Sequence, residues 1–458
     1  MRHILPVLPF IVKFSPVKEI FCNVMFITLH LKNQYQPALQ LTLTLHFSNS
    51  SFKVKFMKNV FPFMLAIFFL SELSIGFAQD KDKKADSGYV FTVIKQLPAT
   101  SVKNQNKSNT CWSYSAISFL ESELLRTGKD TFDLSEMFCV RKAYPDKALM
   151  YVRFNGKHNF GGGGASHDVT SVLRKYGMVP ESAYSGMTIG EPNPVHWEMD
   201  AVLCADVDAV IKNANKKLTP IWLEGFNGLL DGYLGKVPEK FTYKGKEYDA
   251  KSFSGMLGLD ADNYIELSSY THHPFYSRFI LEVPDNWEMG EVHNLPVDEL
   301  IQVIDNSIDQ GYTVVWGADI SEQGFSWKNG VAVVPDRNAP EIAGMESAKW
   351  SKMSDADKDK LLLKFDKPYP EKVITQDMRQ VEFDNYQTTD DHGMHITGIA
   401  HDQNGKKYYL VKNSWGTGGS PYKGYFYASE SYVRLKTMDV MVHKNAIPKG
   451  ISKKLGIN

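Results

Sequence analysis

The feature that most constrains the fold is an uneven distribution of hydrophobic periodicity along the chain. Apolar residues repeat at helical spacing after Cys111, and Gly128 can end that helix. The segments 394–400, 407–413 and 424–429 instead have the character of short antiparallel strands. We therefore predict an α+β fold with a helical subdomain, an antiparallel β subdomain and a cleft between them.

Other elements are expected between these two regions. The predicted segments are a strand at 89–94, a helix capped by Asp133 or Ser135, a helix at 169–176 after the glycine loop 161–164, an amphipathic helix at 296–310 and a strand at 314–319. The region from about 200 to 380 mixes helices and loops, and within it residues 337–380 are polar enough to face solvent. We interpret 89–458 as one domain that carries a large insertion at about 200–380.

Residues 57–78 have the layout of a secretory signal peptide. Lys58 precedes a short apolar run at 60–70, and small residues at Gly76 and Ala78 provide a cleavage site after Ala78. The run is shorter than the roughly 20 residues that a membrane-spanning helix needs. A buried helix of the folded domain is the alternative interpretation.

This segment is internal, although a signal peptide belongs at the start of a chain. We therefore expect Met57 to be the true initiator, with 1–56 an upstream extension outside the fold and 79–88 a flexible lead-in. The protein would then be exported to the periplasm or beyond the cell. No cysteine follows the apolar run, so we expect no lipid anchor, and no stable membrane insertion after the signal is removed.

The charge of the chain excludes one class of partner. Residues 1–56 carry a net charge of +5, so that 79–458 carry −6 within an overall charge of −1. An acidic body lacks the basic surface with which proteins bind nucleic acid. We therefore expect no nucleic-acid partner.

Three cysteines remain beyond the signal segment, and the odd number leaves at least one thiol unpaired. Cys139 and Cys204 lie inside helical patterns and are interpreted as core residues. Cys111 differs, because it follows the polar stretch K-N-Q-N-K-S-N-T and opens a helix. A simple buried thiol is one interpretation, and an activated nucleophile is the other.

The first turn of a helix suits a nucleophilic cysteine, because its free N–H groups and the positive end of the dipole favour a thiolate. A neighbouring histidine would complete an ion pair, and a third group would orient its ring. The late segment D-D-H-G-M-H supplies His392 and His395, and K-N-S-W-G supplies Asn413 and Trp415. The sequence thus contains the parts of a thiol-based hydrolytic site.

These motifs resemble those of the papain-like cysteine peptidases. The chain carries K-N-Q-x5-C-W-S, L-S-E-M, a Gly-Gly loop, H-G-M and K-N-S-W-G in that order. Cys111 and His392 are 281 residues apart, compared with about 130–150 in the common members. Long insertions of this kind, and the stretches 273–283, 296–301 and 311–320, resemble the bleomycin hydrolase and aminopeptidase C branch. The resemblance extends from about residue 90 to 447.

The resemblance implies a role for each motif residue. Cys111 would be the nucleophile, His392 its base and later acid, and Asn413 the group that orients the imidazole. Gln105 would donate its side-chain amide to the tetrahedral oxyanion, and Trp415 would shield the contact between His392 and Asn413 from water. The substrate-binding residues implied are Gly163, Gly164 and Trp112.

Other histidines are less suited to these roles. His392 is preferred to His395, because it precedes a small residue and because three positions along a strand reverse the face. The neighbouring His272 and His273 are expected to point apart, so that we expect no metal and no other cofactor. His158 and His167 flank the glycine loop and are interpreted as surface residues, with substrate contact as the alternative.

The resemblance implies a thiol peptidase that acts on peptides and removes N-terminal residues. In that branch a C-terminal arm lies in the cleft, and its carboxylate receives the substrate ammonium. Here the C-terminal region is basic and is expected to stop short of that position. An exported endopeptidase with an open cleft is therefore one alternative, and an inactive peptidase-shaped binding or assembly protein is another. The branch also implies a possible homohexamer.

Overall fold

The computed structural model describes residues 26–31, 41–47, 50–56, 88–339 and 347–457, and the chain divides into two units, 1–84 and 85–458. In the first unit, the strands β1 (Phe26–Leu31), β2 (Leu41–Phe47) and β3 (Ser50–Phe56) form an antiparallel sheet in that order. The predicted signal peptide, 57–78, lies outside the described residues, as does the lead-in 79–88 except for its last residue.

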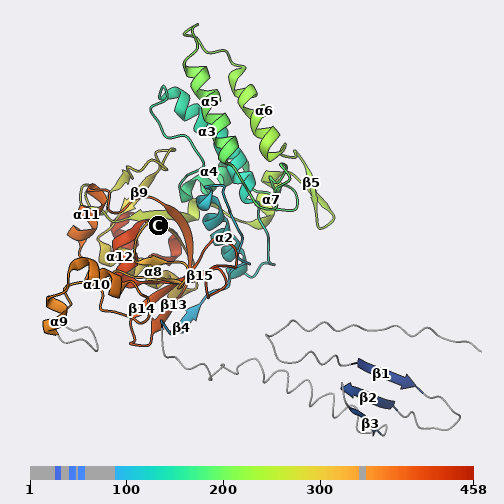
Figure 1. Cartoon of the computed structure of the whole chain (residues 1–458). Helices are drawn as coiled ribbons and strands as arrows, with labels where there is room; N and C mark the ends of the chain where they lie inside the picture. Colours follow the sequence, from blue (N-terminus) through green and yellow to red (C-terminus); the bar gives the residue numbers. More distant parts are fainter. Residues whose placement is uncertain (1–25, 32–40, 48–49, 57–87, 340–346, 458) are drawn as a thin grey trace, which may run out of the picture. The chain divides into compact units, whose positions relative to one another are not determined.

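Helices form the first half of the second unit and pack around α2 (Cys111–Arg126), whose residues from 112 to 124 are all buried. The other helices are α3 (Glu136–Arg153), α4 (Ser166–Tyr176), α5 (Trp197–Ile211), α6 (Trp222–Leu234), α7 (Ala250–Leu257) and the short η2 (Ala261–Asn263). The hairpin of β5 (Phe241–Tyr243) and β6 (Lys246–Tyr248) precedes α7. In Figure 1, α5 and α6 lie side by side and project away from the sheet.

One large sheet forms the second subdomain. Its strands are β4 (Phe91–Gln96), β7 (Tyr264–Ser268), β8 (Arg278–Ile280), β9 (Glu291–Asn294), β10 (Val314–Ala318), β11 (Phe325–Ser326), β12 (Val331–Ala332), β13 (His392–Asp402), β14 (Lys407–Lys412), β15 (Tyr425–Ser429) and β16 (Thr437–His443). They are ordered β11-β12-β15-β14-β13-β10-β16-β7-β9-β8, and β4 pairs with β13. All pairs are antiparallel except β12 with β15 and β7 with β9.

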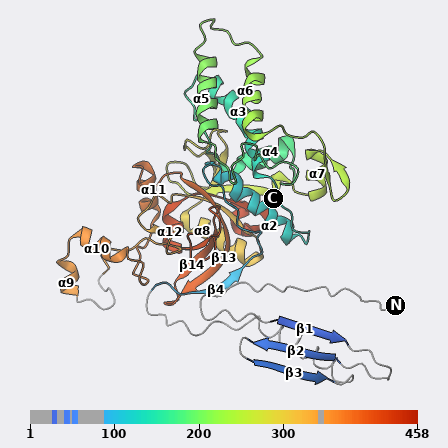
Figure 2. The same cartoon turned by 45° about the vertical axis from the view of Figure 1, so that its right-hand side comes forward.

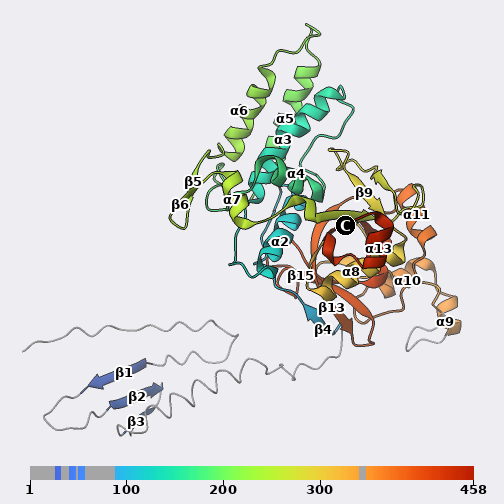
Figure 3. The same cartoon turned by 180° about the vertical axis from the view of Figure 1, so that it is seen from behind.

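The two faces of this sheet carry different cores. On the central strand β10, Val315 belongs to the core around α2, whereas Val314 and Trp316 belong to the core around α8 (Val297–Gln310). This alternation follows from the two-residue period of a strand. The second core also includes side chains from α12 (Glu430–Lys436) and α13 (Lys449–Leu455). Figure 3 shows α13 beside α8.

The described part of the polar region 337–380 has regular structure. It contains α9 (Ser347–Ser351) and α10 (Asp355–Leu362), which share a small hydrophobic cluster built around Trp350 and Tyr369. Figure 2 shows this pair set apart from the helices around α2. The helix α11 (Gln376–Asp384) and the short η3 (Lys444–Ala446) complete the described elements.

The predicted elements are confirmed with small shifts of their ends. Of the two predicted caps, Ser135 is the one that accepts a hydrogen bond from the Phe138 N–H at the start of α3. The helix predicted at 169–176 begins earlier, at Ser166, and Gly128 has the positive φ of +75° expected after α2. No helix among the described residues has the length and apolar character needed to cross a membrane.

Candidate active site

The helical and β subdomains meet where α2 begins. Cys111 is the first residue of α2, His392 is the first residue of β13, and both line the same cavity. Gly393 makes this approach possible, since a Cβ there would lie 2.8 Å from the Ser115 Oγ and 3.3 Å from the Trp112 N. A glycine after the histidine therefore lets the strand pack directly on the first turn of the helix.

The ring of His392 is fixed by two neighbours. Its Nε2 lies 2.8 Å from the Asn413 Oδ1, which also accepts a hydrogen bond of 2.8 Å from the Ser414 N–H. The Trp415 ring stacks on the imidazole with 4.9 Å between ring centroids. Because Nε2 is engaged by Asn413, Nδ1 is the ring nitrogen left to exchange a proton with Cys111. The predicted orienting role of Asn413 and shielding role of Trp415 agree with this geometry.

Gln105 is held by a residue that the sequence analysis did not single out. The Gln105 Oε1 accepts a hydrogen bond of 2.6 Å from the Ser414 Oγ, and the Gln105 N–H donates to the Ser414 carbonyl at 2.8 Å. With its oxygen occupied, the amide NH2 of Gln105 remains as a donor. Ser414 lies inside the K-N-S-W-G motif, which was the only available signal for it.

Trp112 positions the glycine loop, and the individual glycines of the loop have different surroundings. The Trp112 side chain is almost fully buried, and its indole N–H donates to the Gly162 carbonyl at 2.9 Å. Gly164 packs on that indole and lines the cavity, whereas the Cβ position of Gly163 is filled by the carboxylate of Asp285. The Trp112 indole therefore holds the loop in place, and Gly164 is the glycine that faces the cavity.

The charge state of the site differs from the predicted thiolate. Burial raises the pKa of the Cys111 thiol to about 12, and the carboxylate of Asp285 adds to the effect. Hydrogen bonds from the backbone N–H groups of Gly393 and Trp112 lower this pKa but do not offset burial. Burial likewise lowers the pKa of His392 to about 4. In the unliganded site, the neutral thiol and imidazole are the favoured forms, because burial disfavours both charges.

The other histidines near the site have different surroundings. His395 is buried and its Nδ1 lies 2.9 Å from the Ser118 Oγ, which confirms that it does not share the cavity with His392. The interpretation of His167 as a surface residue is wrong. Its Nδ1 lies 2.7 Å from the Glu266 Oε2, and it lines the cavity of Cys111. His158 contacts the Trp287 carbonyl at 2.5 Å.

The expectation that His272 and His273 point apart is also wrong. Their Nε2 atoms lie 3.0 and 2.7 Å from the two oxygens of Glu282, because the chain forms a turn here and not an extended strand. Gln380 donates an amide N–H to the Nδ1 of His272, which places the proton of the neutral ring on Nε2. This hydrogen bond favours an N–H donor to Glu282 over a metal ligand.

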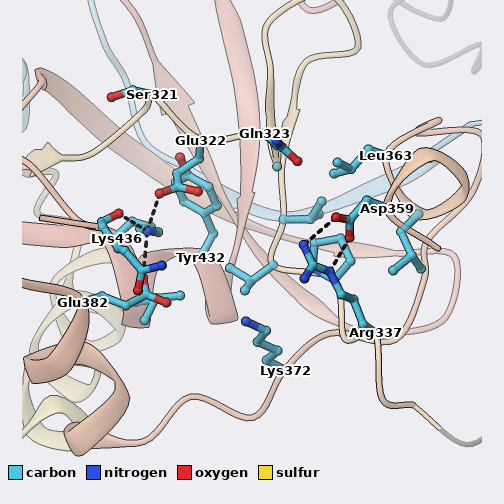
Figure 4. A pocket seen from close by; sticks show the side chains of 17 residues that line it. Ser321, Glu322, Gln323, Arg337, Asp359, Leu363, Lys372, Glu382, Tyr432 and Lys436 are labelled. Atoms are coloured by element: carbon cyan, nitrogen blue, oxygen red, sulfur yellow. Dashed lines mark hydrogen bonds and ion pairs between the residues drawn. The ribbon is translucent and has the colours of Figure 1, made fainter. Parts of the chain in front are cut away.

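A larger cavity, of about 490 Å³, lies elsewhere in the β subdomain and contains none of the predicted site residues. Figure 4 shows two groups of paired charges in its lining, whereas Lys372 is drawn without a partner. Arg337 pairs with Asp359, and Lys436 pairs with Glu322 and Glu382. This arrangement indicates a structural ion-pair network.

Comparison with known proteins agrees with the geometry. A model of the Peptidase C1-like family matches residues 369–457. The chain is 21% identical over 411 residues to aminopeptidase C of Streptococcus thermophilus, which covers 80% of this chain and 85% of that protein. It is 22% identical over 429 residues to aminopeptidase C of Lactobacillus delbrueckii subsp. lactis, which covers 82% of this chain and 86% of that protein.

The fold is similar to a solved structure. PepW from Lactobacillus rhamnosis HN001 matches with a TM-score of 0.60 and 18% identity, over 85% of this chain and 91% of that chain. The chain therefore has a papain-like fold, and its sequence is similar to the Peptidase C1-like family over residues 369–457 and to the aminopeptidase C proteins over about four fifths of its length.

Proposed function

We propose that the protein is a thiol peptidase that removes N-terminal residues from peptides. The observation that carries the proposal is the meeting of Cys111 and His392 in one cavity, with Asn413 on the far nitrogen of the ring. The relatives named aminopeptidase C, similar over four fifths of the chain, favour action at the N-terminus.

The proposed reaction assigns a role to each residue of the site. The Cys111 Sγ attacks the scissile carbonyl carbon while the Nδ1 of His392 takes the thiol proton and passes it to the leaving amine. The amide of Gln105 and the backbone N–H of Cys111 stabilise the oxyanion. Water then hydrolyses the thioester, and His392 serves as the base and returns the proton to the sulfur.

An endopeptidase is the second candidate, and the position of the C-terminal region favours it. The described residues from Lys449 to Ile457 form α13 and its end, where the Ile457 N–H donates to the Ser452 carbonyl at 3.0 Å. None of these residues lines the cavity of Cys111. Residues 449–457 therefore supply no amine receptor in that cavity.

A pair of substrates decides between the two candidates. One fluorogenic peptide is assayed with a free N-terminal amine and with the same amine acetylated, and Cys111→Ala serves as the control. We expect the free-amine form to be cleaved at least about tenfold faster, because a buried charge contact is worth roughly 1.5–3 kcal/mol. Equal rates would exclude the aminopeptidase, and no hydrolysis of either form would exclude the peptidase.

We also propose export through the segment 57–78. Its short apolar run and its small residues at Gly76 and Ala78 support the proposal. N-terminal sequencing of the protein from its native cells should begin at Gln79. Recovery of peptides from residues 1–56 would contradict it.

A further inference from the structure

Carboxyl groups gather on the wall of the cavity that holds the nucleophile. The acidic residues that line it are Glu266, Asp285, Asp390, Asp391 and Asp439. His167 and His392 are the basic residues among the described lining, and Leu281, Val283 and Val292 supply an apolar wall. The proposed reaction uses none of these carboxylates, so they need a separate explanation.

The register of the sheet brings two of them together. On β10, Gly317 pairs with Gly393 on one side and with Asp439 on the other. The two glycines leave the floor of the cavity without side chains, and the Asp439 carboxylate lies against Gly317. Glu266 pairs with Met441, two residues beyond Asp439, and therefore projects from the same face.

Glu266 has an unsatisfied oxygen. The residue is only 8% exposed, and its Oε2 is bound by His167, but its Oε1 has no hydrogen-bond partner. A buried carboxylate oxygen without a donor is costly. Because Glu266 lines the cavity of Cys111, a cationic N–H donor on the substrate can supply the missing hydrogen bond.

The cavity also has more negative groups than it can neutralise. Burial works to lower the pKa of His167, but Glu266 and Asp168 raise it to about 10, so the ring is a cation at neutral pH. Burial and the charge of Glu266 raise the pKa of Asp439 to about 7, although His167 and Arg379 act in the opposite direction.

The pKa of Asp390 is raised for similar reasons. Burial raises its pKa well above the usual range, and Asp285, Asp439 and Asp391 raise it further. For Asp390 and Asp439, burial is the main cause of the raised pKa, and neighbouring carboxylates add to it. A bound cation would relieve this repulsion.

We propose that Glu266, Asp390 and Asp439 form a binding site for a cationic group of the substrate beside Cys111. The inference rests on the proposed peptidase function and names the carboxylates that would receive a cationic group of the substrate. The cation is an ammonium or guanidinium group from one of three sources. The first source is the α-ammonium of the residue just before the cleaved bond. The second is the α-ammonium of the residue that precedes it, and the third is a Lys or Arg side chain on that preceding residue.

Four fluorogenic substrates separate these sources. They are a free aminoacyl amide, a free dipeptidyl amide, an N-acetylated dipeptidyl amide with Lys at the second position, and an N-acetylated amide without charge. We expect Asp439→Asn to raise the KM of the preferred cationic substrate about 10- to 100-fold, as the loss of a charged hydrogen bond predicts. The KM of the uncharged substrate should stay within about twofold.

Two further variants serve as a second test of the site and as a control for the loss of a surface charge. Glu266→Gln should give the same selective loss and keeps the shape of the side chain, with thermal unfolding as the check on folding. Asp377→Asn removes a carboxylate from the exposed surface of α11 and should leave every KM unchanged. Equal KM changes for charged and uncharged substrates, or none, would overturn the cation site while hydrolysis itself upholds the peptidase. Absence of hydrolysis in the wild-type protein would instead refute the proposed function.

Discussion

Two of the cavities among the described residues hold charged side chains in different arrangements. In the larger cavity of Figure 4, Arg337 is paired with Asp359, and Lys436 lies between two glutamates. In the smaller cavity of Cys111, Glu266 keeps an unpartnered oxygen, and Asp390 lies among other carboxylates. Paired charges stabilise a fold without needing a ligand, whereas a buried carboxylate oxygen without a donor indicates that a ligand completes the site.

The largest effect should come from the catalytic histidine. We expect His392→Ala to lower kcat by about 10²- to 10⁴-fold, since it removes the group that carries the proton in both half-reactions. The matched control is His395→Gln, which changes a buried histidine three residues along the same strand. Steady-state hydrolysis should show the loss only for His392, and similar losses in both variants would contradict the assignment.

The next largest effect should come from changing Gln105, the proposed oxyanion donor. Gln105→Ala is expected to lower kcat by about 10²- to 10³-fold with little change in KM, because the amide acts on the transition state. Ser414→Ala leaves the amide in place but frees its oxygen, so we expect a smaller loss. A Ser414→Ala defect larger than that of Gln105→Ala would show that Gln105 is not the donor.

Changes in the larger cavity should affect stability and not catalysis. Lys436 is 3% exposed and bridges Glu322 and Glu382, so Lys436→Met leaves two carboxylates without their cation. Breaking a buried pair on one side typically costs about 3–5 kcal/mol. Denaturant unfolding should report this loss of free energy, while kcat at a permissive temperature stays within about threefold. A selective loss of kcat would instead assign the larger cavity to the reaction.

The smallest effect should appear in the reactivity of the thiol. The Asp285 charge raises the pKa of Cys111, so Asp285→Asn should lower that pKa and increase the thiolate fraction at any pH below it. We expect iodoacetamide to alkylate Cys111 severalfold faster at pH 7, with the rate profile displaced to lower pH. Asp377→Asn is again the control, and an unchanged profile for Asp285→Asn would remove this carboxylate from the electrostatics of the sulfur.

The candidate site residues were predictable because each lies in a short local motif. Cys111 opens a helix whose periodicity is visible, and His392 and Asn413 begin and follow strands with clear alternation. The antiparallel sheet and the helical layer follow from the same patterns. Their meeting at Gly393 depends on a single residue that the H-G-M motif already contains.

The carboxylate cluster was not predictable in this way. Asp439, Glu266 and His167 come from three elements far apart in the chain. The register of β7 and β16 brings the two carboxylates together, and α4 places His167 against Glu266. The main partner of His167, Glu266, lies 99 residues away in the chain, so His167 was taken for a surface residue. The turn that joins His272 to Glu282 was missed for a similar reason, since the chain was treated as extended.

Covalent labelling tests the nucleophile most directly. A peptide-derived epoxide should add once to the protein at pH 7, and tandem mass spectrometry should place the adduct on Cys111. Cys111→Ala should remove the adduct and the hydrolysis together, and His392→Ala should slow the labelling. An adduct on Cys204, or hydrolysis that persists in Cys111→Ala, would contradict the meeting of sulfur and imidazole on which the proposed reaction depends.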